Sequence, residues 1–200
     1  VNTRQAALAL AEGGHEAYTL LGNLGVPSFA FINGVALGGG LELTLACTYR
    51  TVSGSVRALG LPETSLGLVP GWGGAYPLPR LIGIEAAIDV ILRRPAANKP
   101  LSAHDAALLD LVDRVLDPAD FLEESIRWAA SVIRGDISPP RRELDSEADW
   151  TAAVTAPISS TIPVNISRLL PGPRPLSVSS RSLSLSSRSL SLSKGRPRPA

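Results

Sequence analysis

The sequence predicts an α/β fold, and three neighbouring segments carry that prediction. The apolar run 28–32 suits a short buried strand, because a turn at Asn33-Gly34 follows it directly. Three glycines at 38–40 then lead into 41–47, an apolar stretch of strong helix formers. The segment 49–52 is a candidate for the next strand. A strand, a glycine turn, a helix and a second strand in this order are typical of α/β proteins.

The segments on either side extend the same pattern. Apolar spacing predicts a helix over 3–20, although Gly13-Gly14 weakens its middle. Residues 59–74 form a loop rich in glycine and proline, with too few polar residues for a flexible linker. The later candidates are helices over 81–92, 102–109 with Ser102 as its N-cap, and 121–133, and a strand over 111–116. Residues 136–156 are polar, with one candidate helix around Trp150.

Charge divides the chain into two parts near Pro157. Residues 1–156 hold 12 Lys and Arg and all 18 Asp and Glu, a net charge of −6. Residues 157–200 hold 7 Lys and Arg and no acidic residue, a net charge of +7. The total of +1 therefore describes neither part. It does not indicate a nucleic-acid-binding protein, and we expect no nucleic-acid partner.

The basic segment 157–200 is of low complexity. Thirteen of its 44 residues are Ser, none is aromatic, and one heptapeptide occurs identically at 180–186 and 187–193. Such a composition cannot bury enough apolar surface to offset the entropy of ordering, so we expect a disordered tail. The alternative is that its positive charges bind nucleic acid weakly and in a salt-sensitive way.

Other features limit the class of protein. Cys47 is the only cysteine, which excludes an intrachain disulfide and a Cys-based metal cluster, and we predict no metal site. It is consistent with a reducing environment, and we expect a cytoplasmic location. No run of 18 apolar residues predicts a membrane span. The chain holds no Met and starts at Val1, so we expect that an N-terminal segment precedes it.

The glycine turn and two glutamates are the candidate chemistry. A glycine turn at a helix N-terminus presents unpaired N–H groups that suit a phosphate or an oxyanion. Glu42 lies in the first turn of an apolar helix, and Glu63 follows 21 residues later in an apolar and glycine-rich setting. Two carboxylates near N–H donors suit acid–base chemistry. The alternatives are a tight turn packed in the core and an exposed Glu42 favoured by the helix dipole.

Two stretches resemble the signatures of the crotonase superfamily, the enoyl-CoA hydratases and isomerases. The first is 27–42 and the second is 61–74, and the stretches 78–83 and 111–115 resemble later parts of the same pattern. Among members of this superfamily, the sequence of these stretches is similar to the hydratase part of the fatty-acid oxidation multifunctional enzyme, in which a 3-hydroxyacyl-CoA dehydrogenase part follows. Asp110 departs from the pattern, since Gly is usual before Leu-Val-Asp.

The resemblance implies a fold and a division of the chain. It implies a partial crotonase-like ββα spiral core with C-terminal helices. We expect a partial enoyl-CoA hydratase/isomerase-like domain over 1–135, an uncertain polar or helical segment over 136–156, and the disordered tail over 157–200.

The resemblance also implies a reaction, in which water adds to a trans-2-enoyl-CoA. The N–H of Gly39 would hold the thioester oxygen, and Glu42 and Glu63 would act as the acid–base pair. The other implied substrate-binding residues lie in the two signatures: Gly38, Gly40, Pro70, Gly71 and Trp72. Coenzyme A enters as part of the substrate, and no cofactor is expected. The implied partners are the acyl-CoA and either further copies of the chain or a thiolase-containing complex. The alternative is a non-catalytic remnant or interaction piece without turnover.

Overall fold

The computed structural model describes residues 3–155. The predicted disordered tail, 157–200, lies outside the described residues. Two parallel sheets form the centre of the fold. One has three strands in the order β1 (Phe29–Ile32), β3 (Tyr49–Ser53), β5 (Arg114–Leu116). The other pairs β2 (Ala36–Leu37) with β4 (Leu59–Gly60).

Strand β3 lies at the centre of the three-stranded sheet and is largely buried, although it contains the polar residues Arg50, Thr51 and Ser53. Phe31 pairs with Thr51 on one side, and Thr51 pairs with Arg114 on the other. Four of the five β3 residues are buried, as expected for a strand covered on both faces. The Thr51 hydroxyl, which has no exposed surface, makes a 2.7 Å hydrogen bond with the equally buried Ser125 hydroxyl.

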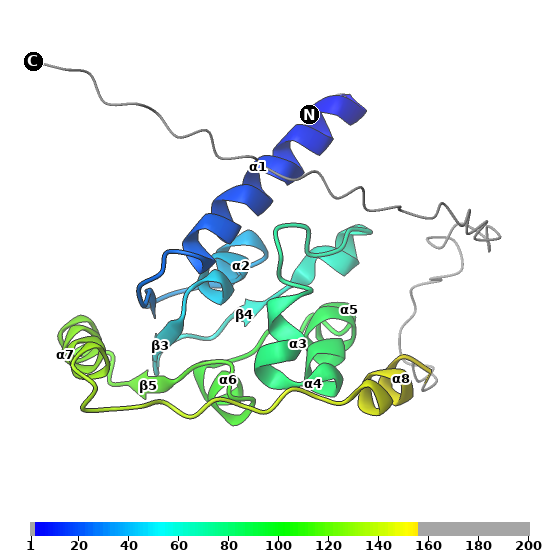
Figure 1. The fold of residues 1–200 in the computed structure, drawn as a ribbon. Helices are drawn as coiled ribbons and strands as arrows, with labels where there is room; N and C mark the ends of the chain where they lie inside the picture. Colours follow the sequence, from blue (N-terminus) through cyan, green and yellow to red (C-terminus); the bar gives the residue numbers. More distant parts are fainter. Residues whose placement is uncertain (1–2, 156–200) are drawn as a thin grey trace, which may run out of the picture. The chain divides into compact units, whose positions relative to one another are not determined.

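Helices follow the strands and complete the α/β pattern (Figure 1). The α-helices are α1 (Arg4–Gly22), α2 (Gly39–Ala46), α3 (Pro77–Ile82), α4 (Ile84–Ile88), α5 (Arg94–Ala96), α6 (Ala103–Leu108), α7 (Phe121–Ile133) and α8 (Glu147–Thr155). A 3-10 helix, η1 (Pro62–Leu66), follows β4, and a π-helix, η2 (Asp89–Arg93), joins α4 to α5. Helix α7 packs beside β1, β3 and β5, whereas α3, α4 and α5 lie together on the other side of β4.

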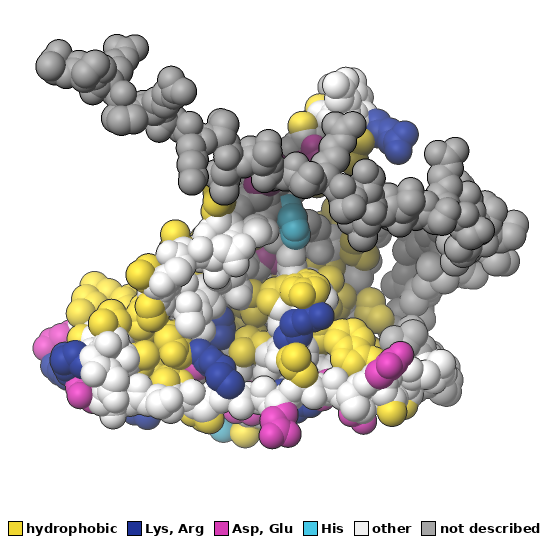
Figure 2. Space-filling model, in the orientation of Figure 1, with side chains coloured by type: hydrophobic (Ala, Val, Ile, Leu, Met, Phe, Trp, Pro, Cys, Tyr) yellow, Lys and Arg dark blue, Asp and Glu magenta, His cyan; other side chains and the backbone are white. Residues whose placement is uncertain are grey.

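The core lies between the sheets and these helices. Its fully buried side chains come from all four stretches that resemble the family pattern and from the segments between them. They are Leu41, Val52, Leu59, Leu61, Leu78, Val90, Leu101 and Leu111. Helix α1 differs from α7, because none of its side chains is buried, and the helix that it packs against is α2. Hydrophobic side chains are also visible on the outer face in Figure 2.

A buried arginine joins the end of α2 to the strands. The Arg50 side chain is 3% exposed and donates hydrogen bonds to the carbonyls of Leu111, Thr44 and Cys47. Burial lowers the pKa of Arg50, and the nearby charge of Asp113 partly restores it. Asp113 also accepts a 2.7 Å hydrogen bond from the Arg50 main-chain N–H. Polar groups that are buried here are thus paired with one another.

Most predicted elements are confirmed, and three differ. The strand expected over 111–116 is limited to Arg114–Leu116, the loop expected over 59–74 contains β4 and η1, and one helix is divided. The first helix continues through Gly13-Gly14, and Ser102 caps α6 in a reciprocal pair with Asp105. The single helix expected over 81–92 is divided, because Gly83 adopts a φ of 87° between α3 and α4. The candidate helix around Trp150 is α8. The boundaries of the predicted domains stay a prediction.

Asp110 occupies a position that favours glycine. Its φ is 57°, in the left-handed region that side chains with a Cβ rarely adopt. Asp110, which stands where the family pattern usually has Gly, is therefore held in a backbone conformation that is less favourable for Asp than for Gly. The residue is exposed and lies between α6 and β5.

Candidate active site

The glycine turn joins the β2–β4 sheet to helix α2. Gly38 has a φ of 55°, and its N–H donates to the Gly60 carbonyl at 2.9 Å, which continues the pairing of β2 with β4. The Gly38 N–H is therefore used within the fold and is not available to a ligand. The N–H groups of Gly39 and Gly40 have no acceptor among the described residues, as expected in the first turn of a helix.

Glu42 is buried at the start of α2 and held by the loop that precedes α3. Its side chain is 4% exposed. Its Oε1 atom accepts hydrogen bonds from the main-chain N–H groups of Trp72, at 3.0 Å, and Gly74, at 2.8 Å. The exposed first-turn alternative for Glu42 is therefore wrong. Gly74 lies so close that a Cβ there would be 2.9 Å from Glu42 Cγ, so the second signature needs glycine at this position.

Glu63 lies in the first turn of η1, on the other side of the glycine turn. Its Oε2 atom is buried without a hydrogen-bond partner in the part of the chain that the structure describes. A Cβ on Gly38 would be 3.0 Å from Glu63 Oε1, which places this carboxyl against the turn. Burial raises the pKa of Glu63, and the charge of Glu42 raises it further, against a lowering by a main-chain hydrogen bond.

A cavity of about 650 Å³ opens beside Glu42. It lies between α1, α2 and the segment 72–77, and this volume is within the range of small-molecule sites. Of the residues predicted from the sequence, Glu42 and Trp72 line it. Its other walls include Tyr18, Leu45 and Tyr76.

The remaining predicted residues lie around this cavity without lining it. Gly38, Gly39 and Gly40 form the glycine turn at the start of α2, and Glu63 lies in η1 against Gly38. Pro70 is buried and Gly71 is exposed in the loop before α3. The structure thus brings Glu42, Trp72 and Gly39 together, with Glu63 against Gly38.

Two residues of α1 belong to this site, and sequence reasoning did not single them out. The Tyr18 hydroxyl donates to the Gly39 carbonyl at 3.1 Å, and its ring meets the Trp72 ring edge-on at 5.7 Å. Burial raises the pKa of Tyr18, and the charge of Glu42 raises it further. Gly14 faces the Trp72 indole, with no room for a Cβ. The signal was the glycine inside a helical pattern, which often has a packing reason.

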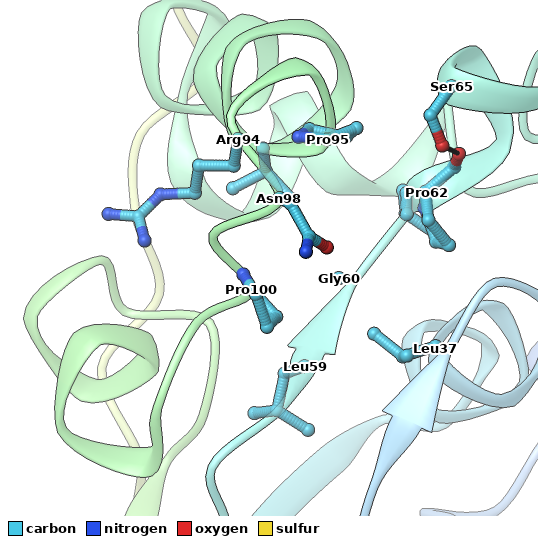
Figure 3. Close-up of a pocket in the computed structure, with 11 residues that line it drawn as sticks. Leu37, Leu59, Gly60, Pro62, Ser65, Arg94, Pro95, Asn98 and Pro100 are labelled. Carbon is cyan, nitrogen blue, oxygen red and sulfur yellow. Dashed lines mark hydrogen bonds between the residues drawn. The ribbon is translucent and has the colours of Figure 1, made fainter.

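A second, smaller cavity of about 80 Å³ lies between the β2–β4 pair and the turn after α5 (Figure 3). Its walls are Leu37, Leu59 and Gly60 on the sheet side, with Pro62 and Ser65 from η1. Figure 3 shows the Asn98 side chain directed toward Gly60 across this space.

Within 3–155, no three His, Cys, Asp or Glu side chains are grouped so that they could hold a metal ion. No helix in this range is long and apolar enough to cross a membrane.

Comparison with curated proteins gives relatives that are named for fatty acid oxidation. The chain is 43% identical over 128 residues to the glyoxysomal fatty acid beta-oxidation multifunctional protein MFP-a of Brassica napus, covering 58% of this chain and 17% of the relative. It is 43% identical over 133 residues to the fatty acid oxidation complex subunit alpha of Shewanella loihica, covering 66% and 18%. The chain therefore spans less than a fifth of these relatives.

Solved structures share the fold. Enoyl-CoA hydratase from Bacillus anthracis matches with a TM-score of 0.58 and 34% identity, over 65% of this chain and 48% of that one. Pseudomonas aeruginosa DspI matches with a TM-score of 0.61 and 30% identity, over 78% and 57%. The chain thus spans about half the length of these structures. The crotonase-like core predicted from the motifs is confirmed.

The family follows from a match to a family model over more than half of the chain. The model of the enoyl-CoA hydratase/isomerase family matches residues 2–141, which include both signatures, the glycine turn and the two glutamates. The chain belongs to the enoyl-CoA hydratase/isomerase family.

Proposed function

We propose that this chain acts on enoyl-CoA thioesters as a hydratase, adding water across the 2,3-double bond of a trans-2-enoyl-CoA. One observation supports the proposal: Glu42 is held by two main-chain N–H groups, and Glu63, whose pKa is raised by burial, is near enough for the charge of Glu42 to raise that pKa further. Environments that differ in this way suit one carboxylate that accepts a proton and one carboxylic acid that gives one. The unpaired N–H of Gly39 lies at the helix N-terminus nearby.

The reaction divides between these groups as follows. The Gly39 N–H donates to the thioester oxygen, and the dipole of α2 supports the negative charge that develops there. Glu42 takes a proton from water as the water oxygen bonds to C3. The π electrons of the double bond move toward the thioester, and the Glu63 carboxyl delivers its proton to C2. Transfer of a proton from Glu42 to Glu63 through solvent then restores the starting state.

The position of Glu42 supports its role as the base. It lines the 650 Å³ cavity, and Oε1 is fixed by the two N–H groups, so the carboxylate orientation does not depend on the ligand. Preorganised groups of this kind avoid reorganisation during the reaction. Glu63 lies against Gly38, the residue before Gly39, and this position supports proton delivery next to the thioester carbonyl.

Loss of the enoyl-thioester absorbance of crotonyl-CoA measures the hydration. Glu42→Gln and Glu63→Gln each remove one ionisable group without a large change of shape, and each is expected to lower turnover at least about 10²-fold. Glu85→Gln is the matched control, because Glu85 is exposed and forms a salt bridge with Arg93, at 3.6 Å, outside the candidate site. Unchanged turnover in both site variants would overturn the assignment.

The second candidate is a chain that folds without turnover, as a non-catalytic remnant or interaction piece. The observation that favours it is the Trp72 indole, which packs against Gly39 where a thioester would approach. This candidate predicts no hydration of crotonyl-CoA by the unmodified chain, so the same assay separates the two.

The expected partners stay predictions. An acyl-CoA is the proposed substrate, and Shewanella loihica has a relative named as a subunit of a fatty acid oxidation complex. We propose that the chain forms either a homo-oligomer or a thiolase-containing complex, which size measurements with and without a thiolase would separate. The cytoplasmic location is likewise a prediction, and two plant relatives are named glyoxysomal and peroxisomal.

A further inference from the structure

The indole of Trp72 lies in a slot formed by two glycines of different helices. A Cβ built on Gly14 of α1 would overlap the indole at Nε1. A Cβ built on Gly39 of α2 would lie 2.5 Å from Cζ3 and 2.7 Å from Cε3 of the same ring. Only glycine at both positions allows the ring to lie between the helices, because real Cβ atoms do not approach other atoms this closely.

The ring is also fixed from the side and through its own main chain. Tyr18 contacts it edge-on, with ring centroids 5.7 Å apart and planes at 82°, a favoured geometry for aromatic pairs. The Trp72 N–H donates to Glu42 Oε1 at 3.0 Å. The side chain of Trp72 therefore covers Gly39, while its main chain holds the proposed base.

The place of the ring bears on any acyl chain at this site. Trp72 is a wall of the 650 Å³ cavity, whereas Gly39, which packs against the same ring, does not line that cavity. An acyl group whose thioester oxygen meets the Gly39 N–H must pass the ring to place carbons beyond C3 in the cavity. A short chain does not need that space, whereas a long chain does.

We propose that Trp72 is a specificity-determining residue, which restricts the site to short-chain acyl-CoA thioesters by filling the slot between Gly14 and Gly39. This inference rests on the proposed binding of enoyl-CoA thioesters. Apolar pockets discriminate by roughly 10-fold or more for each methylene that fits or fails to fit. Removing the indole is thus expected to change the preference between short and long chains strongly.

The test compares binding of butyryl-CoA and decanoyl-CoA by calorimetry. Both are saturated and cannot be hydrated, so the readout does not require turnover. The chain is tested unmodified and as Trp72→Ala and Trp72→Phe, and both variants keep the N–H that binds Glu42. We expect the affinity for decanoyl-CoA relative to butyryl-CoA to rise at least about 10-fold in Trp72→Ala, and by less in Trp72→Phe.

Trp150→Phe is the control, because Trp150 lies in α8, away from the slot, and its ratio of affinities is expected to stay unchanged. Circular dichroism checks that each variant is folded, and Trp72→Phe keeps the test open if Trp72→Ala fails to fold. An unchanged or lower ratio in the folded variants overturns the proposal, as does absence of binding in all forms.

Hydration of crotonyl-CoA and trans-2-decenoyl-CoA separates this inference from the proposed function. If the chain binds with the predicted shift in selectivity but hydrates neither thioester, the hydratase assignment fails and the role of Trp72 stands. If it hydrates crotonyl-CoA and the ratio of kcat/KM for the two substrates is the same in Trp72→Ala, the role of Trp72 fails and the hydratase assignment stands.

Discussion

The main-chain N–H of Trp72 donates a 3.0 Å hydrogen bond to Oε1 of Glu42, and Gly74 donates a second one to the same atom. Through these bonds the second signature holds the carboxylate that the first signature supplies. The two stretches are separate in sequence, and the hydrogen-bonded carboxylate of Glu42 requires both of them.

Gly74→Ala is expected to disturb Glu42, because the added methyl would lie 2.9 Å from Cγ and 3.0 Å from Oε1. Displacing the carboxylate should lower crotonyl-CoA hydration at least about 10²-fold, as loss of the base does. Gly34→Ala is the matched control, because Gly34 is exposed and its new methyl would have nothing within 4 Å. Equal activity of the two variants would contradict the close packing around Glu42.

Adjacent glycines in α1 are expected to respond in opposite ways to alanine. Gly13 is exposed, with nothing within 4 Å of a new Cβ, so Gly13→Ala should raise the free energy of unfolding by about 1 kcal/mol through helix propensity. Gly14→Ala gains the same propensity but forces the Trp72 indole out of its slot, which should cost more than it gains. Urea unfolding measures both, and stabilisation by both substitutions would exclude the tight slot.

The raised pKa of Glu63 predicts how stability depends on pH. The folded state binds the Glu63 proton more tightly than the unfolded state, whose carboxyl titrates near its usual value of 4.5. The free energy of unfolding should therefore fall as pH rises from about 4.5 through the raised folded-state pKa, and level off above it. Glu63→Gln should reduce this slope, and urea unfolding of both forms across pH 4–8 checks it. The same slope in both would remove Glu63 as its source.

Asp110→Gly is expected to stabilise the fold. Asp110 has a φ of 57°, and relieving this conformation should raise the free energy of unfolding by about 1 kcal/mol, less the extra freedom of glycine in the unfolded chain. Asp120→Gly is the control, because Asp120 is also exposed but has a φ of −115°. Thermal unfolding should show a higher Tm for the first variant alone.

Local patterns were enough to predict much of this fold. The buried strand β3, the cap at Ser102 and the helix that begins at the three glycines each depend on neighbouring residues. The break at Gly83 depends on one backbone conformation within an otherwise helical pattern, and the spacing of apolar residues does not report it.

Contacts between distant segments account for what sequence patterns did not predict. The burial of Arg50 requires carbonyls from the end of α2 and from Leu111, which only the folded chain brings together. The same is true at the site: the motifs named Glu42 and Trp72, but the hydrogen bond between them spans 30 positions. Tyr18 joins them from a helix with no signature of its own.

Helix α1 has no buried side chain, and its most intimate contacts are those of Gly14 and Tyr18 with the Trp72 ring. Segments with little buried surface open locally at far lower free energy than the core does. The amide hydrogens of α1 should therefore exchange with solvent much faster than those of β3. A ligand that fills the cavity beside α1 would slow the exchange of these amide hydrogens and leave exchange in β3 unchanged. Exchange in α1 would therefore report whether the cavity is occupied.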